Sequence, residues 1–237
     1  MQRRHLSCTA TPSPEPNCDM KRYLPFIIVA IVAVVAVGAG AMLYRTKRAA
    51  MTSGAQPGAP SKPLKPEHVR GAMKAPVTLE EFGDFQCPAC ATVAGMLNPI
   101  EAEYGSNLRV VFWNFPLAMH KHGREAALAA EAASLQGQFW QMHDLLYEKQ
   151  SAWSTADDVQ PVFEQFATQL KLDTERFKKD YASVDVAARV DRQHEYGVSR
   201  GVKNTPTVFV NGRELPPPFN RDRIREAITA ALPAAKS

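Results

Sequence analysis

Two cysteines whose spacing suits redox chemistry, Cys87 and Cys90, enclose a proline and an alanine. They follow an apolar run, Val77 to Phe82, and precede a segment that we predict to be helical, Ala91 to Tyr104. The two thiols are therefore expected one turn apart at a helix N-terminus. There the helix dipole and the unpaired N–H groups favour a thiolate, so we expect the pKa of Cys87 to lie below its free value of about 8.5. Cys87 is the candidate nucleophile.

Cys90 lies three residues farther on, inside the first helical turn, and is expected to be more buried and to keep its proton. From there its sulfur can attack a mixed disulfide formed at Cys87. Pro88 at the first helical position costs no hydrogen bond, because that N–H would be unpaired in any case. Cys90 is therefore the candidate resolving thiol.

A Cys-x-x-Cys motif can also be half of a zinc site or a plain structural disulfide. The only other cysteines, Cys8 and Cys18, lie on the far side of a long apolar segment, and no histidine pair at zinc-finger spacing accompanies the motif. This spacing favours redox chemistry that needs neither a metal nor a cofactor. Cys8 and Cys18 have no predicted role.

The apolar segment, Tyr23 to Tyr44, has 22 residues without a charge, and about 20 apolar residues suffice to cross a bilayer. We predict one transmembrane segment with basic flanks at 21–48. The alternative is a cleaved signal peptide that begins at Lys21, with Ala39-Gly40-Ala41 as its cleavage site and a secreted product. Because disulfide chemistry belongs in an oxidising compartment, we expect the C-terminal part in the periplasm or otherwise outside the cytoplasmic membrane.

The remaining organisation follows from composition. Residues 1–20 are expected to be a disordered tail or a start-site artefact, with Met20 as a second possible start. Residues 49–66 contain four prolines among small residues and are predicted to be a linker, which leaves 67–237 as one domain. Residues 1–48 hold seven Lys/Arg against two Asp/Glu, and the rest of the chain holds 21 against 22. The basic balance therefore comes from the membrane flanks, and no nucleic-acid surface is expected.

The domain begins with a predicted strand–helix–strand unit, because Val77 to Phe82 and Leu108 to Phe115 are rich in β-branched and aromatic residues. Pro99 is predicted to bend the intervening helix near Asn98. Four or five helices are then expected in a row, over 124–150 with Gly137 in its middle, 157–170, 174–181 and 184–196. Ser154 and Thr155 resemble N-cap signals for the second of these and Asp173 for the third.

The chain is expected to end with a strand at Thr205 to Val210, a turn at Asn211-Gly212, a short strand near Arg213 to Leu215 and a helix at Arg221 to Leu232. We therefore predict an α/β fold with a mixed sheet flanked by helices.

Three stretches, Glu80 to Cys90, Phe139 to Leu146 and Asn204 to Gly212, resemble the DsbA-like branch of the thioredoxin superfamily. The resemblance extends from about Ala75 to the C-terminus, and similar proteins include membrane-anchored thiol:disulfide oxidoreductases of bacteria. It implies a thioredoxin fold with an inserted helical subdomain at about 117–200.

The resemblance also implies roles for residues around the dithiol. The family's cis-proline falls on Pro206, where an X-Pro bond lowers the cost of the cis form to about 0.5–1 kcal/mol. Thr205 would offer backbone groups to an extended substrate segment, with Pro206, Pro88 and Ala89 also contacting the substrate. The alternative for Pro206 is an ordinary trans proline that opens an edge strand.

Glu81 stands six residues before Cys87, where the family carries a buried acid. We predict that it relays the proton of Cys90 and that burial raises its pKa; the alternative is a strand glutamate that faces solvent. Asp84 is expected to shape the loop before the motif. The family's namesake has a histidine where this chain has Ala89, so the dithiol is expected to be a weaker oxidant.

Three histidines, His120, His122 and His143, could suggest a metal or catalytic site, but capping or packing is the expected role. The predicted function is an envelope thiol:disulfide oxidoreductase, with oxidation of protein substrates favoured over reduction or isomerisation. We expect a monomer that meets an unidentified redox partner, which could be membrane-bound. A substrate-binding module and a carrier of a soft metal ion are the competing classes.

Overall fold

The computed structural model describes residues 64–233. The predicted tail, the membrane segment with its cleavage alternative, nearly all of the linker, and Cys8 and Cys18 lie outside the described residues. Within the described range, no helix combines the length and the apolar character needed to cross a membrane. The expectations for the N-terminal segments therefore stay predictions.

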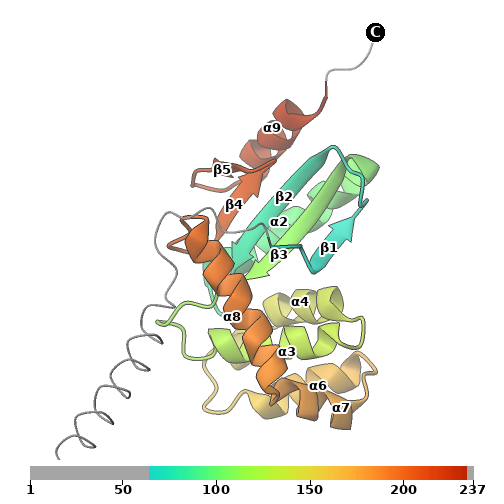
Figure 1. Ribbon diagram of the computed structural model, residues 1–237, viewed down its shortest axis with the longest axis vertical. Helices are drawn as coiled ribbons and strands as arrows, with labels where there is room; N and C mark the ends of the chain where they lie inside the picture. The colour runs from blue at the N-terminus through green and yellow to red at the C-terminus, as the bar shows by residue number, and fades with distance from the viewer. Residues whose placement is uncertain (1–63, 234–237) are drawn as a thin grey trace, which may run out of the picture. The chain divides into compact units, whose positions relative to one another are not determined.

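The described residues form a five-stranded mixed sheet with the strand order β1-β3-β2-β4-β5 (Figure 1). β2 and β3 are parallel, and the other neighbouring pairs are antiparallel. The strands are β1 His68–Gly71, β2 Val77–Gly83, β3 Leu108–Asn114, β4 Thr207–Val210 and β5 Arg213–Leu215. The predicted mixed sheet is confirmed. The edge strand β1 was not predicted, because its sequence His-Val-Arg-Gly has too little apolar alternation to indicate a strand.

Helix α2, Pro88–Tyr104, connects the two parallel strands. It buries Val93, Leu97 and Ile100 against the sheet, and it continues across Pro99 without a break. A proline inside a helix removes a single backbone hydrogen bond, and the buried face of α2 extends on both sides of that position. The bend at Asn98 stays a prediction.

The helical insertion follows β3 and packs as a separate layer below the sheet in Figure 1. Its members are α3 Gly123–Ser134, α4 Phe139–Glu148, α5 Gln150–Trp153, α6 Gln160–Gln169, α7 Thr174–Tyr181 and α8 Val184–Ser199. The sequence left open whether 124–150 holds one helix or two. The chain turns at Gly137, whose φ of 74° suits a residue without a side chain, so α3 ends before it and α4 begins after it.

The N-cap predictions had mixed outcomes. Asp173 caps α7 by accepting a hydrogen bond from the backbone N–H of Arg176 at 3.0 Å. Ser154 and Thr155 do not cap α6, since that helix begins later, at Gln160, after Val159. The turn at Asn211-Gly212 is confirmed: both residues have positive φ, 46° and 79°, as a tight hairpin between β4 and β5 requires.

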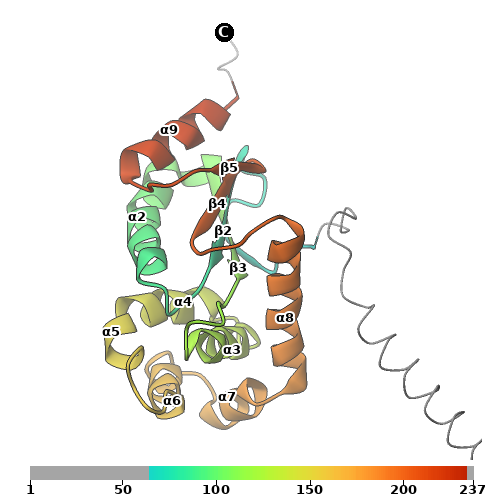
Figure 2. The ribbon, with the colours of Figure 1, turned by 90° about the vertical axis from the view of Figure 1, so that its left-hand side faces the viewer.

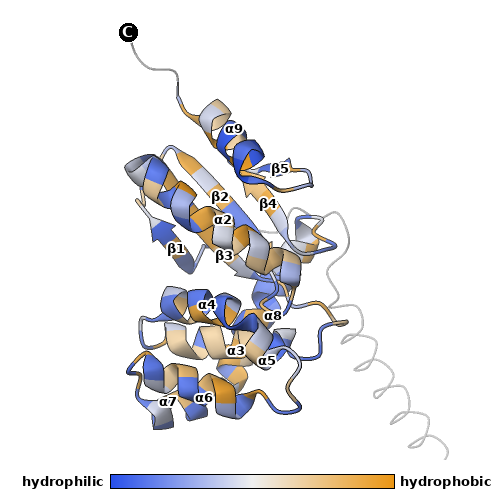
Figure 3. Ribbon diagram, turned by 180° about the vertical axis from the view of Figure 1, so that it is seen from behind, coloured by the Kyte–Doolittle hydropathy of each residue, from blue (hydrophilic) through white to orange (hydrophobic). Residues whose placement is uncertain are grey.

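Helices cover both faces of the sheet (Figure 2). On one face, α2 and α9, Arg221–Ala231, pack on Val77, Leu79 and Val208. On the other face, Tyr196 of α8 packs against the cluster that contains Phe82 and Trp113. Hydrophobic residues accordingly line β2 and β4 in the middle of the sheet and recur along α3 in the helical layer (Figure 3).

Candidate active site

The dithiol stands at the start of α2, where β2 passes into the helix. Cys87 is the N-cap residue, with an extended backbone at φ −74° and ψ 120°, and Pro88 begins the helix. Both described cysteines carry free thiols. Cys87 is 7% exposed and Cys90 is fully buried, while Pro88 and Ala89 between them are exposed. The predicted difference in burial is present.

The two thiols differ strongly in acidity. The hydrogen bond from the Cys90 thiol lowers the pKa of Cys87 to about 5, helped by the backbone N–H groups of Cys90 and Ala89 and opposed by burial. Burial raises the pKa of Cys90 well above its ordinary value, and its hydrogen bond to Cys87 and the nearby Glu81 add to this effect. At neutral pH the site therefore holds a Cys87 thiolate and a Cys90 thiol.

A loop from the C-terminal part of the chain faces Cys87. The peptide bond between Thr205 and Pro206 is cis, so the predicted cis-proline is confirmed and the trans alternative is wrong. The Sγ atom of Cys87 lies 3.5 Å from the carbonyl oxygen of Thr205. Thr205 and Pro206 are half-buried and lead directly into β4. The chain thus places the backbone carbonyl group of Thr205 next to the nucleophile.

Glu81 is buried, with 1% of its surface exposed, so the solvent-facing alternative is wrong. Burial, and secondarily the negative charge of Cys87, raise its pKa to about 8. Among the described residues, its Oε1 atom has no hydrogen-bond partner. An acid with this pKa can exchange a proton near neutral pH, but its role as a relay stays a prediction.

Asp84 organises the loop that precedes Cys87. Its buried carboxylate accepts hydrogen bonds from the backbone N–H groups of Gln86 and Leu117, each at 2.8 Å, and pairs with Nδ1 of His120 at 2.7 Å. Gly123 makes room for it, since a Cβ atom there would lie 2.6 Å from Asp84 Oδ1. The expectation that Asp84 shapes this loop is confirmed.

Two glutamines that the sequence did not single out tie the dithiol loop to the helical insertion. Gln150 Nε2, at the start of α5, donates hydrogen bonds to the carbonyl oxygens of Phe85 at 2.7 Å and Cys87 at 3.0 Å. Gln86 Nε2 donates to the carbonyl oxygen of Ser154 at 2.7 Å. Nothing in the local sequence marks these glutamines, because their partners are distant backbone groups.

The three histidines have polar partners within the fold, as expected for packing roles. His122 contacts the carbonyl oxygen of Ala156 through Nε2 at 2.8 Å, and Nδ1 of His143 pairs with Oδ1 of Asp144 at the same distance. His120 pairs with Asp84. His122 occupies the N-cap position of α3, but its hydrogen bonds go to other groups.

A separate cluster brings the exposed Glu67 together with the buried His68 and Glu131, with possible ligand atoms within 4.8 Å of one another. These residues fit a metal ion poorly. Oε1 of Glu131 already pairs with His68 at 2.6 Å, and Arg189 lies 3.2 Å from its Oε2 atom. Arg189 also binds Glu67, so its guanidinium group already supplies the positive charge for both carboxylates. The cluster acts as a structural contact between β1, α3 and α8.

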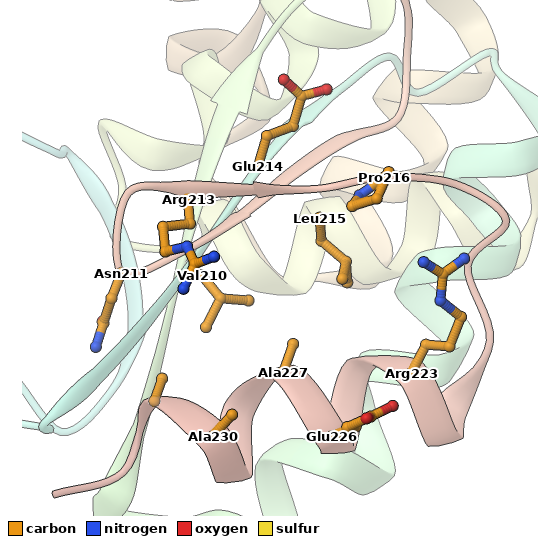
Figure 4. A pocket seen from close by; sticks show the side chains of 11 residues that line it. Val210, Asn211, Arg213, Glu214, Leu215, Pro216, Arg223, Glu226, Ala227 and Ala230 are labelled. Atoms are coloured by element: carbon orange, nitrogen blue, oxygen red, sulfur yellow. The ribbon is translucent and has the colours of Figure 1, made fainter.

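An open groove of about 470 Å³ lies between β5 and α9 (Figure 4). It is lined by apolar residues such as Val210, Leu215 and Ala227, with Arg213 and Arg223 among the charged residues around them. The groove meets β4 at Val210, the opposite end of that strand from the cis-proline. It is therefore separate from the dithiol.

The parallel strand–helix–strand unit, the dithiol at its helix N-terminus and the cis-proline loop beside it define a protein of the thioredoxin-fold class. Residues 64–230 match the family described as Thioredoxin, and the chain belongs to that family.

Known proteins show the same relationship. The chain is 37% identical over 177 residues to the Na(+)/H(+) antiporter NhaA 3 of Salinispora tropica, in an alignment that covers 73% of this chain and 26% of that protein. The chain thus spans about a quarter of the length of the curated relatives it matches. Among solved structures, oxidised BdbD from Bacillus subtilis is 27% identical with a TM-score of 0.60, covering 69% of this chain and 91% of that one. Alpha-DsbA1 from Wolbachia pipientis, 16% identical with a TM-score of 0.63 over 72% of this chain and 93% of that one, shares the fold.

Proposed function

We propose that this protein is a thiol:disulfide oxidoreductase that acts on cysteines of protein substrates and works mainly as an oxidase. The observation that carries the proposal is the placement of Cys87 at the N-cap of α2 beside the cis-proline loop, with the fully buried Cys90 one turn farther on. This placement lowers the pKa of Cys87 to about 5 and raises that of Cys90. A structural disulfide or a buried core cysteine has no need of such a difference.

The oxidative reaction begins with the Cys87–Cys90 disulfide. A substrate thiolate attacks Sγ of Cys87, the bond to Cys90 breaks, and the Cys90 sulfur takes up a proton. A second substrate thiolate then attacks the substrate sulfur of the mixed disulfide, and Cys87 leaves as a thiolate. The substrate gains a disulfide, and its two electrons remain on Cys87 and Cys90.

The acidity of Cys87 favours this direction, because a thiol with a low pKa is a better leaving group and stabilises the reduced enzyme. Its pKa of about 5 lies between those of the DsbA cysteine, about 3.5, and the thioredoxin cysteine, about 7. With Ala89 in place of a histidine, we expect a reduction potential between about −120 mV and about −270 mV, the values for those two proteins. A redox titration against glutathione measures it, and a potential as high as that of DsbA would contradict the role given to Ala89.

Substrate binding is proposed at the surface around Cys87. The backbone of Thr205, next to the cis-proline Pro206, offers hydrogen bonds to an extended segment, and the exposed Pro88 and Ala89 supply apolar contact. Backbone pairing depends little on substrate side chains, which suits an enzyme with many substrates.

The proposed place of action is outside the cytoplasm, with the domain held by the predicted membrane segment at 21–48. Support comes from the apolar length of that segment and from the need of a disulfide-forming enzyme for an oxidising compartment. We expect a monomer that a separate redox partner reoxidises.

The test follows the oxidation of a reduced two-cysteine peptide by the full chain in detergent, with Cys87→Ala and Cys90→Ala as variants. We expect Cys87→Ala to be inactive and Cys90→Ala to accumulate a mixed disulfide with the peptide. Full activity of Cys87→Ala would contradict the proposal. A Cys90→Ala variant that traps no mixed disulfide would refute the division of labour between the two thiols.

A further inference from the structure

Several buried polar atoms beneath the dithiol lack protein partners. Among the described residues, Oε1 of Glu81, the hydroxyl oxygen of Tyr147 and Nε2 of His143 are buried and have no hydrogen-bond partner. Buried polar groups nearly always bond to protein or to ordered water, and each unpaired group costs about 1–3 kcal/mol. Three such atoms in one region indicate a site where internal water bridges polar side chains.

Tyr147 and His143 come from α4 and Glu81 from β2, and the hydroxyl of Tyr147 is the group that reaches the strand. Glu81 and Gly83 point to the same face of β2 because side chains alternate along a strand. A Cβ atom on Gly83 would lie 3.0 Å from the hydroxyl oxygen of Tyr147, so this hydroxyl reaches β2 two residues from Glu81. The ring centroids of Tyr147 and His143 are 5.0 Å apart. The two residues are four positions apart in the sequence and therefore lie on the same side of α4.

His143 connects this buried region to the surface. Its Nδ1 atom lies 2.8 Å from Oδ1 of Asp144, which requires an N–H at Nδ1 and leaves the lone pair of Nε2 in the interior. The side chain of Asp144 is 43% exposed, and Arg70 Nη1 donates to both of its oxygens at 3.0 and 2.9 Å. Arg70 also binds Glu101, so Asp144 is held in place at the solvent boundary.

We propose that protons pass between Cys90 and solvent through Glu81, Tyr147, His143 and Asp144, with internal water bridging the gaps between the buried groups. The inference rests on the proposed function and extends it from the dithiol to α4. Tyr147, His143 and Asp144 contact neither the substrate nor a sulfur atom in this scheme. They act through Glu81, by passing protons between its carboxyl group and solvent.

The proton balance follows the sulfur chemistry in both directions. When a substrate thiolate displaces Cys90 from Cys87, the departing Cys90 sulfur takes the proton of Glu81, and solvent resupplies Glu81 through Asp144, His143 and Tyr147. When Cys90 attacks a mixed disulfide, Glu81 first releases its own proton to solvent through the same groups and then takes the proton of Cys90. Tyr147 gives up its own proton as it receives another, since burial keeps its pKa well above the ordinary value.

The competing interpretation is that His143 and Tyr147 only fill the core, where both pack against Phe85 and Phe112. The two interpretations differ for Tyr147→Phe. This substitution removes an oxygen that has no hydrogen-bond partner among the described residues. A packing role predicts unchanged or higher stability and unchanged kinetics, whereas a relay role predicts slower chemistry in a protein of intact stability.

The experiment mixes the reduced full chain with oxidised glutathione in a stopped-flow instrument. The second-order rate constant at low glutathione disulfide measures attack by Cys87, and the limiting rate at high concentration measures resolution by Cys90. We expect Tyr147→Phe and His143→Gln each to slow resolution at least about 10-fold, a threshold below the roughly 10²–10⁴-fold that a general acid or base contributes directly, because these groups act through Glu81. Attack by Cys87 should change less than about twofold by the same reasoning, because its thiolate needs no proton transfer.

Tyr181→Phe is the matched control, because it removes a tyrosine hydroxyl from α7 in the same helical layer. It should leave both rates unchanged. Resolution at the control rate in Tyr147→Phe would overturn the relay, even if His143→Gln proved too unstable to assay. That result would leave the proposed function intact as long as Cys87→Ala remains inactive, so the two proposals fail separately.

Discussion

Replacement of Glu81 by glutamine should change how the stability of the protein depends on pH. The carboxyl is buried, and its pKa is about 8 in the folded chain against an ordinary value of 4.5. At about 1.4 kcal/mol per pH unit, the folded state holds this proton more tightly by roughly 5 kcal/mol. Glutamine is a neutral substitute of the same shape and has no proton to lose.

The sign of the effect follows from the raised pKa. Glu81 supports folding fully below pH 4.5, where the carboxyl is protonated in both states, and this support is lost as the pH rises through 8. Cys87 acts in the opposite sense in the reduced protein. Its lowered pKa supports folding at alkaline pH, and the support is lost as the pH falls through about 5. The two effects partly cancel between pH 5 and pH 8.

The measurement therefore uses a Cys87→Ala background, which removes the opposing thiolate. Urea unfolding at pH 5, 6, 7 and 8 compares Cys87→Ala with the double variant Cys87→Ala/Glu81→Gln. Without the Cys87 charge the pKa of Glu81 lies somewhat below 8, and burial remains the main cause that raises it. We therefore expect the stability of Cys87→Ala to fall by up to about 3 kcal/mol relative to the double variant across this range. Other titrating groups are common to both proteins and cancel in the difference. A difference that stays constant with pH would refute the argument that burial holds Glu81 in its protonated form.

Three further predictions concern the loop, the buried contact and the nucleophile. Gly123→Ala should destabilise the protein by about 1–3 kcal/mol, because its Cβ would lie 2.6 Å from Asp84 Oδ1. The control Gly95→Ala, on α2, places a Cβ that meets nothing within 4 Å and should stabilise the protein by about 0.5–1 kcal/mol. Equal effects of the two substitutions in thermal unfolding would contradict the conclusion that Gly123 makes room for Asp84. Glu131→Ala should lower the free energy of unfolding in urea by about 3–5 kcal/mol, because it leaves His68 and Arg189 without their buried carboxylate. A loss below about 1 kcal/mol, as at an exposed pair, would contradict a structural role for this contact between β1, α3 and α8. The rate of Cys87 alkylation should rise with a midpoint near pH 5, and a midpoint near the free-thiol value of about 8.5 would show that the neighbouring groups do not stabilise the thiolate.

Sequence reasoning located the chemistry because the relevant causes are local. A helix N-terminus acidifies a cysteine through groups of its own first turn, and the Cys87-Pro-Ala-Cys90 spacing fixes both thiols relative to that turn. The Asn211-Gly212 hairpin depends only on which residues tolerate positive φ. Asp173 was recognised as a cap for the same kind of reason.

The failures have a different cause. Helix boundaries near Gly137 and Val159 depend on how the insertion packs, and the strand β1 owes its place to pairing with β3, a partner about forty residues farther along the chain. No local pattern encodes such pairings. The alternation of side chains along β2 likewise did not decide whether Glu81 faces the core or solvent.

The sequence by itself indicated the two cysteines that we propose to exchange the disulfide and the order in which they act, since the acidity of Cys87 and the position of Cys90 arise within one helical turn. Only the tertiary structure decided that Glu81 is buried, that Gln150 holds the Cys87 backbone, and that the hydroxyl of Tyr147 reaches β2 near Glu81. These relations join residues more than sixty positions apart. These residues meet only once the sheet and the helical insertion have packed together. The hydrophobic effect drives that packing but is not directional, so a local sequence pattern does not specify which distant side chains come into contact.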